Sequence, residues 1–183
     1  MKFDKIYLTG FMTSGKSTIG PILANVLGWS FYDLDNEIVK EQNKSIDEIF
    51  ADLGEAAFRE METKKLREIS CKQKCIIALG GGTVINGDNL AFIKNNGKLI
   101  YLKSSANSIY NRIKSKLDRP LFKDLVLENK PREDFVERID QILNKREAYY
   151  NQADLIVETN TRNIGPIIDY IANKIEKLMH EKN

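Results

Sequence analysis

GFMTSGKS, residues 10–17, is the stretch that decides the fold of this 183-residue chain. It fits the P-loop pattern GxxxxGK[ST], in which glycines at both ends let the backbone curl so that successive N–H groups point at phosphate oxygens. Lys16 can then reach the β- and γ-phosphates of a nucleotide, while the Ser17 hydroxyl can bind Mg²⁺. The nucleotide-binding residues expected in and beside this motif are Gly10, Met12, Thr13, Ser14, Gly15, Lys16, Ser17 and Thr18.

Short apolar runs alternate with longer amphipathic stretches along the chain, as in a parallel sheet covered by helices. Strands are expected at residues 5–9, 30–34, 75–79, 99–102 and 155–157. Helices are expected at residues 16–27, 55–70, 88–96, 106–116, 133–151 and 164–180. A further helix begins at a capping box of Ser45 and Glu48 and is interrupted at Gly54. This alternation predicts an α/β fold.

Residues 116–132 are the weakest stretch for regular structure, because they contain Pro120, Pro131 and many charges. We interpret them as a mobile surface loop rather than a domain boundary. The chain is long enough for one domain and too short for two ordinary ones. The prediction is therefore a single domain over residues 1–183. It is an α/β fold of three layers, with a five-stranded parallel sheet flanked by helices and a mobile lid at about residues 116–132.

The bulk composition argues against several classes of function. The net charge of +2, from 28 basic and 26 acidic residues, gives no reason to expect nucleic acid or an anionic membrane as the partner. No apolar stretch approaches the ~18 residues that span a bilayer, and the N-terminus lacks the features of a signal peptide. Cys71 and Cys75 have no companion His or Cys cluster, so two reduced thiols are favoured over a metal site. We expect a cytoplasmic protein.

The metal-binding carboxylate of a P-loop enzyme usually comes from an Asp at the end of another strand. The third and fourth strands end without an acid, and Asp154 stands at the N-terminal end of the fifth. The second strand ends in Asp33-Leu34-Asp35, and residues i and i+2 of an extended chain project to the same side. One acid would serve the metal, and the other would orient or deprotonate an attacking hydroxyl. The alternative is a helix cap at Asp35 or Asn36, with Asp33 merely solvated.

The chain resembles the shikimate kinase family in segments that follow the family's order and spacing and cover nearly the whole chain. These segments are GFMTSGKSTIG, FYDLDNEI, SIDEIFADLGEAAFREME, IIALGGGTV, RPLF and TRNIGPI. Many kinases share the first, whereas the combination of DxD, GExxFRxxE and GGG is far more specific. The resemblance implies a P-loop NMP-kinase-like fold. It also implies that a monomer transfers the γ-phosphoryl group of ATP, with Mg²⁺, to the 3-hydroxyl of shikimate, with no nucleic acid or membrane as partner.

The resemblance also implies a role for each matching residue. Asp33, with Ser17, would serve Mg²⁺, and Asp35 would hold the acceptor hydroxyls and act as the base. The residues implied to bind shikimate are Asp35, Arg59, Gly80, Gly81, Gly82 and Arg146, with Met12, Phe50 and Phe58 along the apolar side of its ring. The nucleotide residues implied beyond the P-loop are Arg112, Arg119 and the stretch Arg162–Ile164. Lys16, Asp35 and Arg119 would carry the catalysis.

Elementary chemistry fits these roles, although simpler explanations stay open. Two arginine forks suit a planar carboxylate, and a triple glycine leaves room for close approach. Arg59 alone would also fit a surface ion pair, the glycines a flexible turn, and the two phenylalanines ordinary core packing. A kinase for another small acid such as gluconate, or a nucleotide sensor without catalysis, are the alternative functions. Ile164 stands where the family usually has proline, so altered contacts to adenine are expected.

Overall fold

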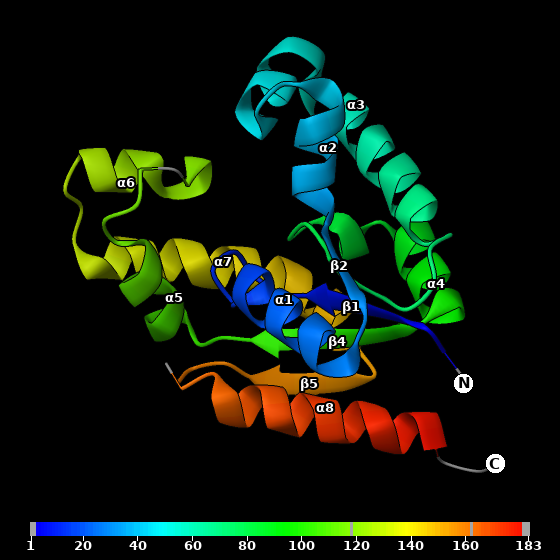
Figure 1. The fold of residues 1–183 in the computed structure, drawn as a ribbon. Coiled ribbons are helices and arrows are strands. Elements are labelled where there is room, and N and C mark those ends of the chain that lie inside the picture. The colour runs from blue at the N-terminus through cyan, green and yellow to red at the C-terminus, as the bar shows by residue number, and fades with distance from the viewer. Residues whose placement is uncertain (1–2, 118, 162, 181–183) are drawn as a thin grey trace.

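The computed structural model describes residues 3–117, 119–161 and 163–180, which contain a five-stranded parallel sheet (Figure 1). The strand order is β2-β3-β1-β4-β5. The strands are β1 Lys5–Thr9, β2 Ser30–Asp33, β3 Cys75–Ala78, β4 Lys98–Lys103 and β5 Leu155–Glu158. The helices are α1 Lys16–Leu27, α2 Leu34–Gln42, α3 Ile46–Ile69, α4 Gly87–Asn96, α5 Ala106–Ile113, α6 Lys123–Leu127, α7 Arg132–Tyr150 and α8 Gly165–His180, with 3₁₀ turns η1 Thr83–Ile85 and η2 Pro120–Phe122. The predicted parallel sheet flanked by helices is confirmed.

Helices cover both faces of the sheet because successive strand residues point to opposite sides. In β1, Ile6 and Leu8 are buried in a cluster with residues of α1 and α8. Tyr7, between them, is buried in a second cluster with residues of α2, α3, α4 and α7. A strand that is buried on both faces has a continuous run of apolar residues, and this run made the position of β1 predictable.

The carboxyl ends of β1, β2 and β3 meet at one edge of the sheet. Leu8 of β1 and Asp33 of β2 both pair with Ala78 of β3. Gly10 lies two residues after Leu8, and Gly80 lies two residues after Ala78. The P-loop, the start of α2 and the triple glycine therefore leave the sheet side by side, where ligands of open α/β sheets bind.

Helix α2 was not predicted. The strand expected to reach Leu34 ends at Asp33, whose side chain accepts a hydrogen bond from the Asn36 N–H at 3.3 Å and so caps α2. The prediction that Asp33 and Asp35 project from one extended strand was therefore wrong, and the cap is Asp33 rather than Asp35 or Asn36. The helix was missed because only Leu34 and Ile38 are buried in its nine residues, which leaves a faint apolar period.

The break at Gly54 and the capping box before α3 are confirmed. Ser45 accepts from the Glu48 N–H, and the Glu48 carboxylate accepts from the Ser45 N–H at 2.8 Å. Gly54 has φ 80° and ψ 170°, which interrupts the helical conformation inside α3. The site arginine Arg59 therefore lies on the part of α3 that follows this break.

Residues 116–132 contain more regular structure than expected, namely η2 and α6. Phe122 and Leu125 are buried in a third cluster with Phe11 of the P-loop and residues of α5 and α7. Asp124 also accepts from Arg138 of α7 at 2.7 Å. The expectation of an irregular loop was wrong because these apolar residues, spaced among charges, anchor the segment to the P-loop and to α7. In Figure 1, α6 lies at the edge of the molecule above α7.

Candidate active site

The P-loop between β1 and α1 has the curled backbone that its glycines predict. Gly10 has φ 146° and Gly15 has φ 107°, values that L side chains rarely adopt. Thr13, with φ 61°, lies in the left-handed region. Within the described residues, no acceptor is found for the backbone N–H groups of residues 13 and 15–17. The loop therefore offers several backbone donors to an anion such as a phosphate.

Lys16 lies across this loop and near two acids. Its Nζ donates to the carbonyl oxygens of Gly10 at 2.8 Å and Phe11 at 3.2 Å. Burial lowers the pKa of Lys16 to about 8, while the negative charges of Asp35 and Asp33 oppose this shift. The ammonium is therefore close to both carboxylates, as expected of a group that neutralises phosphate charge between them and the P-loop.

Asp33 lies beside Ser17. The Ser17 hydroxyl donates to Asp33 Oδ2 at 3.2 Å, and Asp33 Oδ1 accepts from the Asn36 N–H that begins α2. Hydroxyl and carboxylate oxygens are hard ligands of the kind that Mg²⁺ prefers. The described residues contain no group of three or more His, Cys, Asp or Glu that could hold a metal. A divalent ion here would depend on phosphate and water for most of its ligands.

Asp35 lies in the first turn of α2, and its Oδ1 is buried without a hydrogen-bond partner in the part of the chain that the structure describes. Burial, and then the negative charges of Glu62 and Asp33, raise the pKa of Asp35 to about 6, although Lys16 and Arg59 oppose this. A carboxylate with an unused oxygen and a pKa close to working pH is suited to accept a proton.

The triple glycine that follows β3 lies next to Asp35 and to both arginines predicted to bind the acceptor. A Cβ on Gly80 would lie 2.6 Å from Glu62 Oε1 and 2.9 Å from Asp35 Oδ1. A Cβ on Gly81 would lie 2.9 Å from Arg146 Nη1 and 3.9 Å from the Gly10 carbonyl oxygen. A Cβ on Gly82 would lie 2.9 Å from both Nη1 and Nη2 of Arg59. A side chain at any of these three positions would therefore displace one of these groups, and the structure brings Asp35, Arg59 and Arg146 together around the turn.

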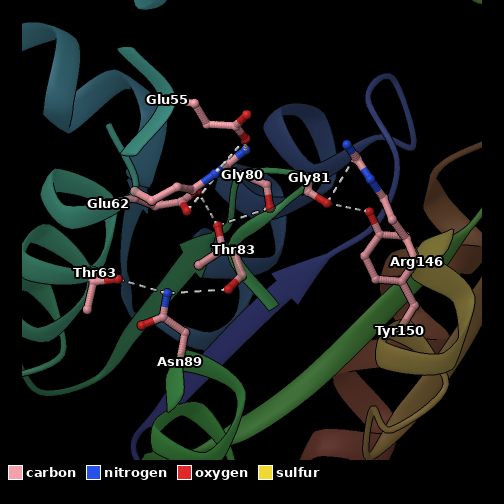
Figure 2. A network of polar contacts seen from close by, with 10 residues as sticks. Glu55, Glu62, Thr63, Gly80, Gly81, Thr83, Asn89, Arg146 and Tyr150 are labelled. Carbon is pink, nitrogen blue, oxygen red and sulfur yellow. Dashed lines mark hydrogen bonds and ion pairs between the residues drawn. The ribbon is translucent and has the colours of Figure 1, made fainter. Parts of the chain in front are cut away.

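Two carboxylates of α3, Glu55 and Glu62, bind Arg59, and Figure 2 labels both acids. Its Nε and Nη2 donate to Glu55 Oε1 at 3.3 Å and 3.1 Å, and its Nη1 donates to Glu62 Oε2 at 3.0 Å. Glu62 is 1% exposed, and its other oxygen accepts from the Thr83 hydroxyl at 2.7 Å. Nη1 and Nη2 each keep one further N–H group for a ligand, and both atoms lie next to Gly82.

The i, i+3 spacing of Arg59 and Glu62 favours their pairing, whereas Glu55 and Thr83 were missed from the sequence. The Thr83 hydroxyl also lies 3.1 Å from the Gly80 carbonyl oxygen, and Thr83 O accepts from Asn89 Nδ2 at 3.4 Å. The i, i+4 spacing of Glu55 and Arg59 was a usable signal. Thr83 offered none, because its partner Glu62 is 21 residues away in sequence.

Arg146 reaches the site from α7, on the other side of the glycines. Its Nη1 donates to the Gly81 carbonyl oxygen at 3.1 Å. Its charge also acts on Lys16, whose pKa it lowers. Arg59 and Arg146 therefore flank the turn at residues 80–82 from α3 and α7, as Figure 2 shows for the groups around Gly80 and Gly81.

The remaining predicted arginines are Arg112, Arg119 and Arg162. Arg112 Nη1 donates to the Thr13 carbonyl oxygen at 2.7 Å, and Arg112 Nη2 donates to the Thr159 carbonyl oxygen at 2.5 Å. Arg112 thus braces the P-loop against the end of β5. The positive charge of Arg119 lowers the pKa of Lys16. Arg162 lies outside the described residues.

The apolar residues predicted to line the acceptor ring have mixed positions. Phe50 and Phe58 are in contact, with ring centroids 4.8 Å apart, and Phe58 is buried in the cluster under α3. Met12 packs at the edge of the cluster that contains Phe11. Ile164 packs against the cluster under α8. Phe58 thus has a clear packing role, and Phe50 and Met12 are only partly buried.

Comparison with known proteins agrees with this geometry. A family model described as shikimate kinase matches residues 12–176. The shikimate kinase of Chlorobaculum parvum is 46% identical over 172 residues, which are 94% of this chain and 92% of that protein. The chain belongs to the shikimate kinase family. The shikimate kinase of Chlorobaculum tepidum is 45% identical over 172 residues, which are 94% of this chain and 90% of that protein.

Solved shikimate kinases also share the fold of this family member. The crystal structure of the enzyme from Bacteroides thetaiotaomicron has a TM-score of 0.84 at 30% identity, over 97% of this chain and 99% of that one. The shikimate kinase of Acinetobacter baumannii, solved in complex with shikimate, has a TM-score of 0.81 at 31% identity, over 97% and 93% of the two chains. The predicted P-loop NMP-kinase-like fold and family are confirmed. Among the described residues, no helix combines the length and apolar character needed to cross a membrane.

Asp35, whose Oδ1 is buried, should lower the stability of the folded chain at neutral pH. The pKa of Asp35 is raised from 3.8 to about 6 on folding, so the folded chain binds this proton more tightly than the unfolded chain. The contribution of Asp35 to stability is therefore fully present below pH 3.8 and is lost as pH rises through about 6. We expect the free energy of unfolding of Asp35→Asn, relative to that of wild type, to rise by about 2 kcal/mol as the pH increases from 4 to 7.

Urea unfolding of metal-free protein at several pH values measures this difference. Asp88→Asn is the matched control, because Asp88 is an exposed acid in the first turn of α4. A difference between Asp35→Asn and wild type that stays constant from pH 4 to pH 7 would contradict the burial of this carboxyl group.

A methyl group at Gly80 should damage both the fold and the site. Its Cβ would lie 2.6 Å from the buried Glu62 Oε1, closer than real Cβ atoms approach. We expect Gly80→Ala to lose about 1–3 kcal/mol of unfolding free energy and to lower turnover. Gly87→Ala is the control, since a Cβ on Gly87 meets nothing within 4 Å. Urea denaturation of both variants checks this, and equal stability of the two would show that the contact at Gly80 relaxes freely.

Proposed function

We propose that this chain transfers the γ-phosphoryl group of ATP to the 3-hydroxyl of shikimate, which gives shikimate 3-phosphate and ADP. The observation that carries the proposal is the turn at residues 80–82, because one short segment contacts the acid, both arginines and the P-loop. Family membership and the shikimate complex of the Acinetobacter baumannii relative support the choice of substrate.

The acceptor binds where its carboxylate and hydroxyl groups find matching charges. The Nη1 and Nη2 groups of Arg59, together with Arg146, take the carboxylate, since guanidinium groups bind carboxylates bidentately. Asp35 takes the acceptor hydroxyl with its Oδ1, which has no hydrogen-bond partner within the described residues. The backbone at Gly80, Gly81 and Gly82 approaches the ring, and Phe50, Phe58 and Met12 lie along its apolar side.

Nucleotide phosphates bind in the P-loop, where the backbone N–H groups of residues 13 and 15–17 have no acceptor among the residues that the structure describes. Lys16 contacts the β- and γ-phosphates, and Arg119 contacts the transferring group. We assign Arg112 and the Arg162–Ile164 stretch to the adenine side, with Ile164 in place of the usual proline. Arg112 suits this role because it already joins the P-loop to the end of β5.

Mg²⁺ fits the donor set at Ser17 and Asp33. These residues offer one hydroxyl and one carboxylate 3.2 Å apart, both of them hard oxygen ligands. Ser17 would hold the ion directly, and Asp33 would hold it through water. When bound, the ion neutralises charge on the phosphate oxygens.

Transfer proceeds in one in-line step without a covalent enzyme intermediate. The bond between the γ-phosphorus and the β–γ bridging oxygen breaks while a bond to the shikimate oxygen forms. The hydroxyl proton passes to Asp35, and ADP leaves. Lys16 and Arg119 stabilise the charge on the transferring group, and most of the catalysis comes from this positioning.

The segment 116–132 acts as a lid over the phosphates within a single domain of residues 1–183. Its attachment to Phe11 through Phe122, with ring centroids 6.2 Å apart, supports a link between lid and P-loop. Closure of the lid would exclude water that competes as acceptor. We further propose a monomer that works in the cytoplasm, where ATP is available and thiols stay reduced.

Purified protein with ATP, Mg²⁺ and shikimate tests the function through coupled ADP release. We expect ADP release that depends on both shikimate and Mg²⁺, with phosphate appearing on the 3-hydroxyl by ³¹P NMR. Gluconate serves as the competing acid. Release of ADP with gluconate but not with shikimate would sink the proposal, and so would a rate that is unchanged when shikimate is omitted.

A further inference from the structure

Tyr150, the last residue of α7, makes a contact that none of the roles above includes. Its hydroxyl donates to the Gly81 carbonyl oxygen at 2.6 Å, and its side chain is fully buried. Figure 2 shows Tyr150 and Arg146 converging on Gly81 from the same side. A core tyrosine therefore reaches the backbone of the segment that lies next to Asp35, Arg59 and Arg146.

Two donors fix the direction of the Gly81 carbonyl. The Tyr150 hydroxyl lies at 2.6 Å and Arg146 Nη1 at 3.1 Å from the same oxygen. The described residues contain no cis peptide bond, so the N–H of Gly82 points opposite to this carbonyl and away from α7. Within the same residues, no acceptor is found for that N–H. A flexible glycine turn thus presents one free donor in a fixed direction.

The Tyr150 hydroxyl is itself held in place by the core. Its ring packs against Tyr101 of β4, with centroids 4.9 Å apart, and Tyr101 is only 2% exposed. Burial raises the pKa of Tyr150, so the phenol stays protonated and remains a donor. Arg146, by contrast, is partly exposed and would also bind the substrate carboxylate. Tyr150 is the donor that keeps the turn oriented when Arg146 engages the ligand.

We propose that Tyr150 is a positioning residue for the acceptor: its hydroxyl holds the Gly81–Gly82 peptide so that the Gly82 N–H faces an oxygen of shikimate. The inference rests on the proposed function, because it takes shikimate as the ligand of this turn. A purely structural role would lower stability without distinguishing the two substrates. A positioning role raises the KM for shikimate and leaves the KM for ATP unchanged.

Tyr150→Phe separates these roles, because it removes one oxygen and keeps the ring on Tyr101. We expect the KM for shikimate to rise about fivefold, as for the loss of one hydrogen bond, with the KM for ATP close to wild type and the melting temperature lower by only about 2–4 °C. Tyr101→Phe is the matched control, since it removes a buried phenol from the same ring pair without touching Gly81. Calorimetry of shikimate binding without ATP gives the same comparison independently of turnover.

The outcomes distinguish this inference from the function on which it rests. Wild-type protein that does not phosphorylate shikimate overturns the function. Active wild type with an unchanged KM for shikimate in Tyr150→Phe, or with both KM values raised equally, overturns the positioning role. If the variant does not fold, ¹⁵N-glycine labelling of wild type decides: the Gly82 amide signal must shift when shikimate is added alone, and a static signal refutes the proposal.

Discussion

Asp35→Asn should lower the kcat of this shikimate kinase by about 10²–10⁴-fold while ATP binding survives. The amide has the shape of the acid but cannot take the hydroxyl proton, so the step that needs a base fails. The nucleotide contacts come from the P-loop and are not altered. Coupled ADP release measures turnover, and isothermal titration calorimetry with ATP measures binding.

The stability of the variant makes the loss interpretable. Because burial raises the pKa of Asp35 to about 6, its removal should stabilise the protein at pH 7, so inactivity cannot come from unfolding. The control Asp88→Asn removes an acid from the equivalent turn of α4 and should retain full activity. If Asp35→Asn loses ATP binding together with turnover, the role of Asp35 is wrongly assigned.

The parts of the fold that sequence predicted are those specified by local chemistry. The P-loop could be placed because its glycine spacing is needed for one backbone conformation, and Gly10 and Gly15 adopt it. Strands buried on both faces, such as β3, appear as unbroken apolar runs. The break at Gly54 followed from glycine's conformational freedom. Each of these signals lies within a few residues.

The parts that sequence did not predict depend on contacts between distant segments. Helix α2 is held by two buried residues and an N-cap, so its sequence shows little of the apolar periodicity that identifies a helix. Asp33 and Asp35 do face the P-loop, but because α2 begins between them rather than because a strand continues. The hydrogen bond from Tyr150 to Gly81 joins residues 69 positions apart, and no spacing in the sequence predicts it. Site geometry of this kind comes from packing.

Lys16→Met should lower kcat/KM for ATP by about 10²–10³-fold, the usual loss when one group that stabilises transition-state charge is removed. Methionine keeps the apolar stem and loses the ammonium that contacts the P-loop carbonyls of Gly10 and Phe11. The fold should persist, because burial lowers the pKa of Lys16 to about 8 and so the charged form is disfavoured there.

Steady-state kinetics and thermal melts of Lys16→Met check both halves of this expectation. Lys40→Met is the control, since Lys40 is exposed at the end of α2 and pairs only with Glu37 among the described residues. A melting temperature like that of wild type, combined with the loss of turnover, would locate the effect in the chemistry. Activity within tenfold of wild type would mean that Arg119 and the backbone donors neutralise the transferring phosphoryl group without Lys16, and the division of charge proposed for this site would have to be abandoned.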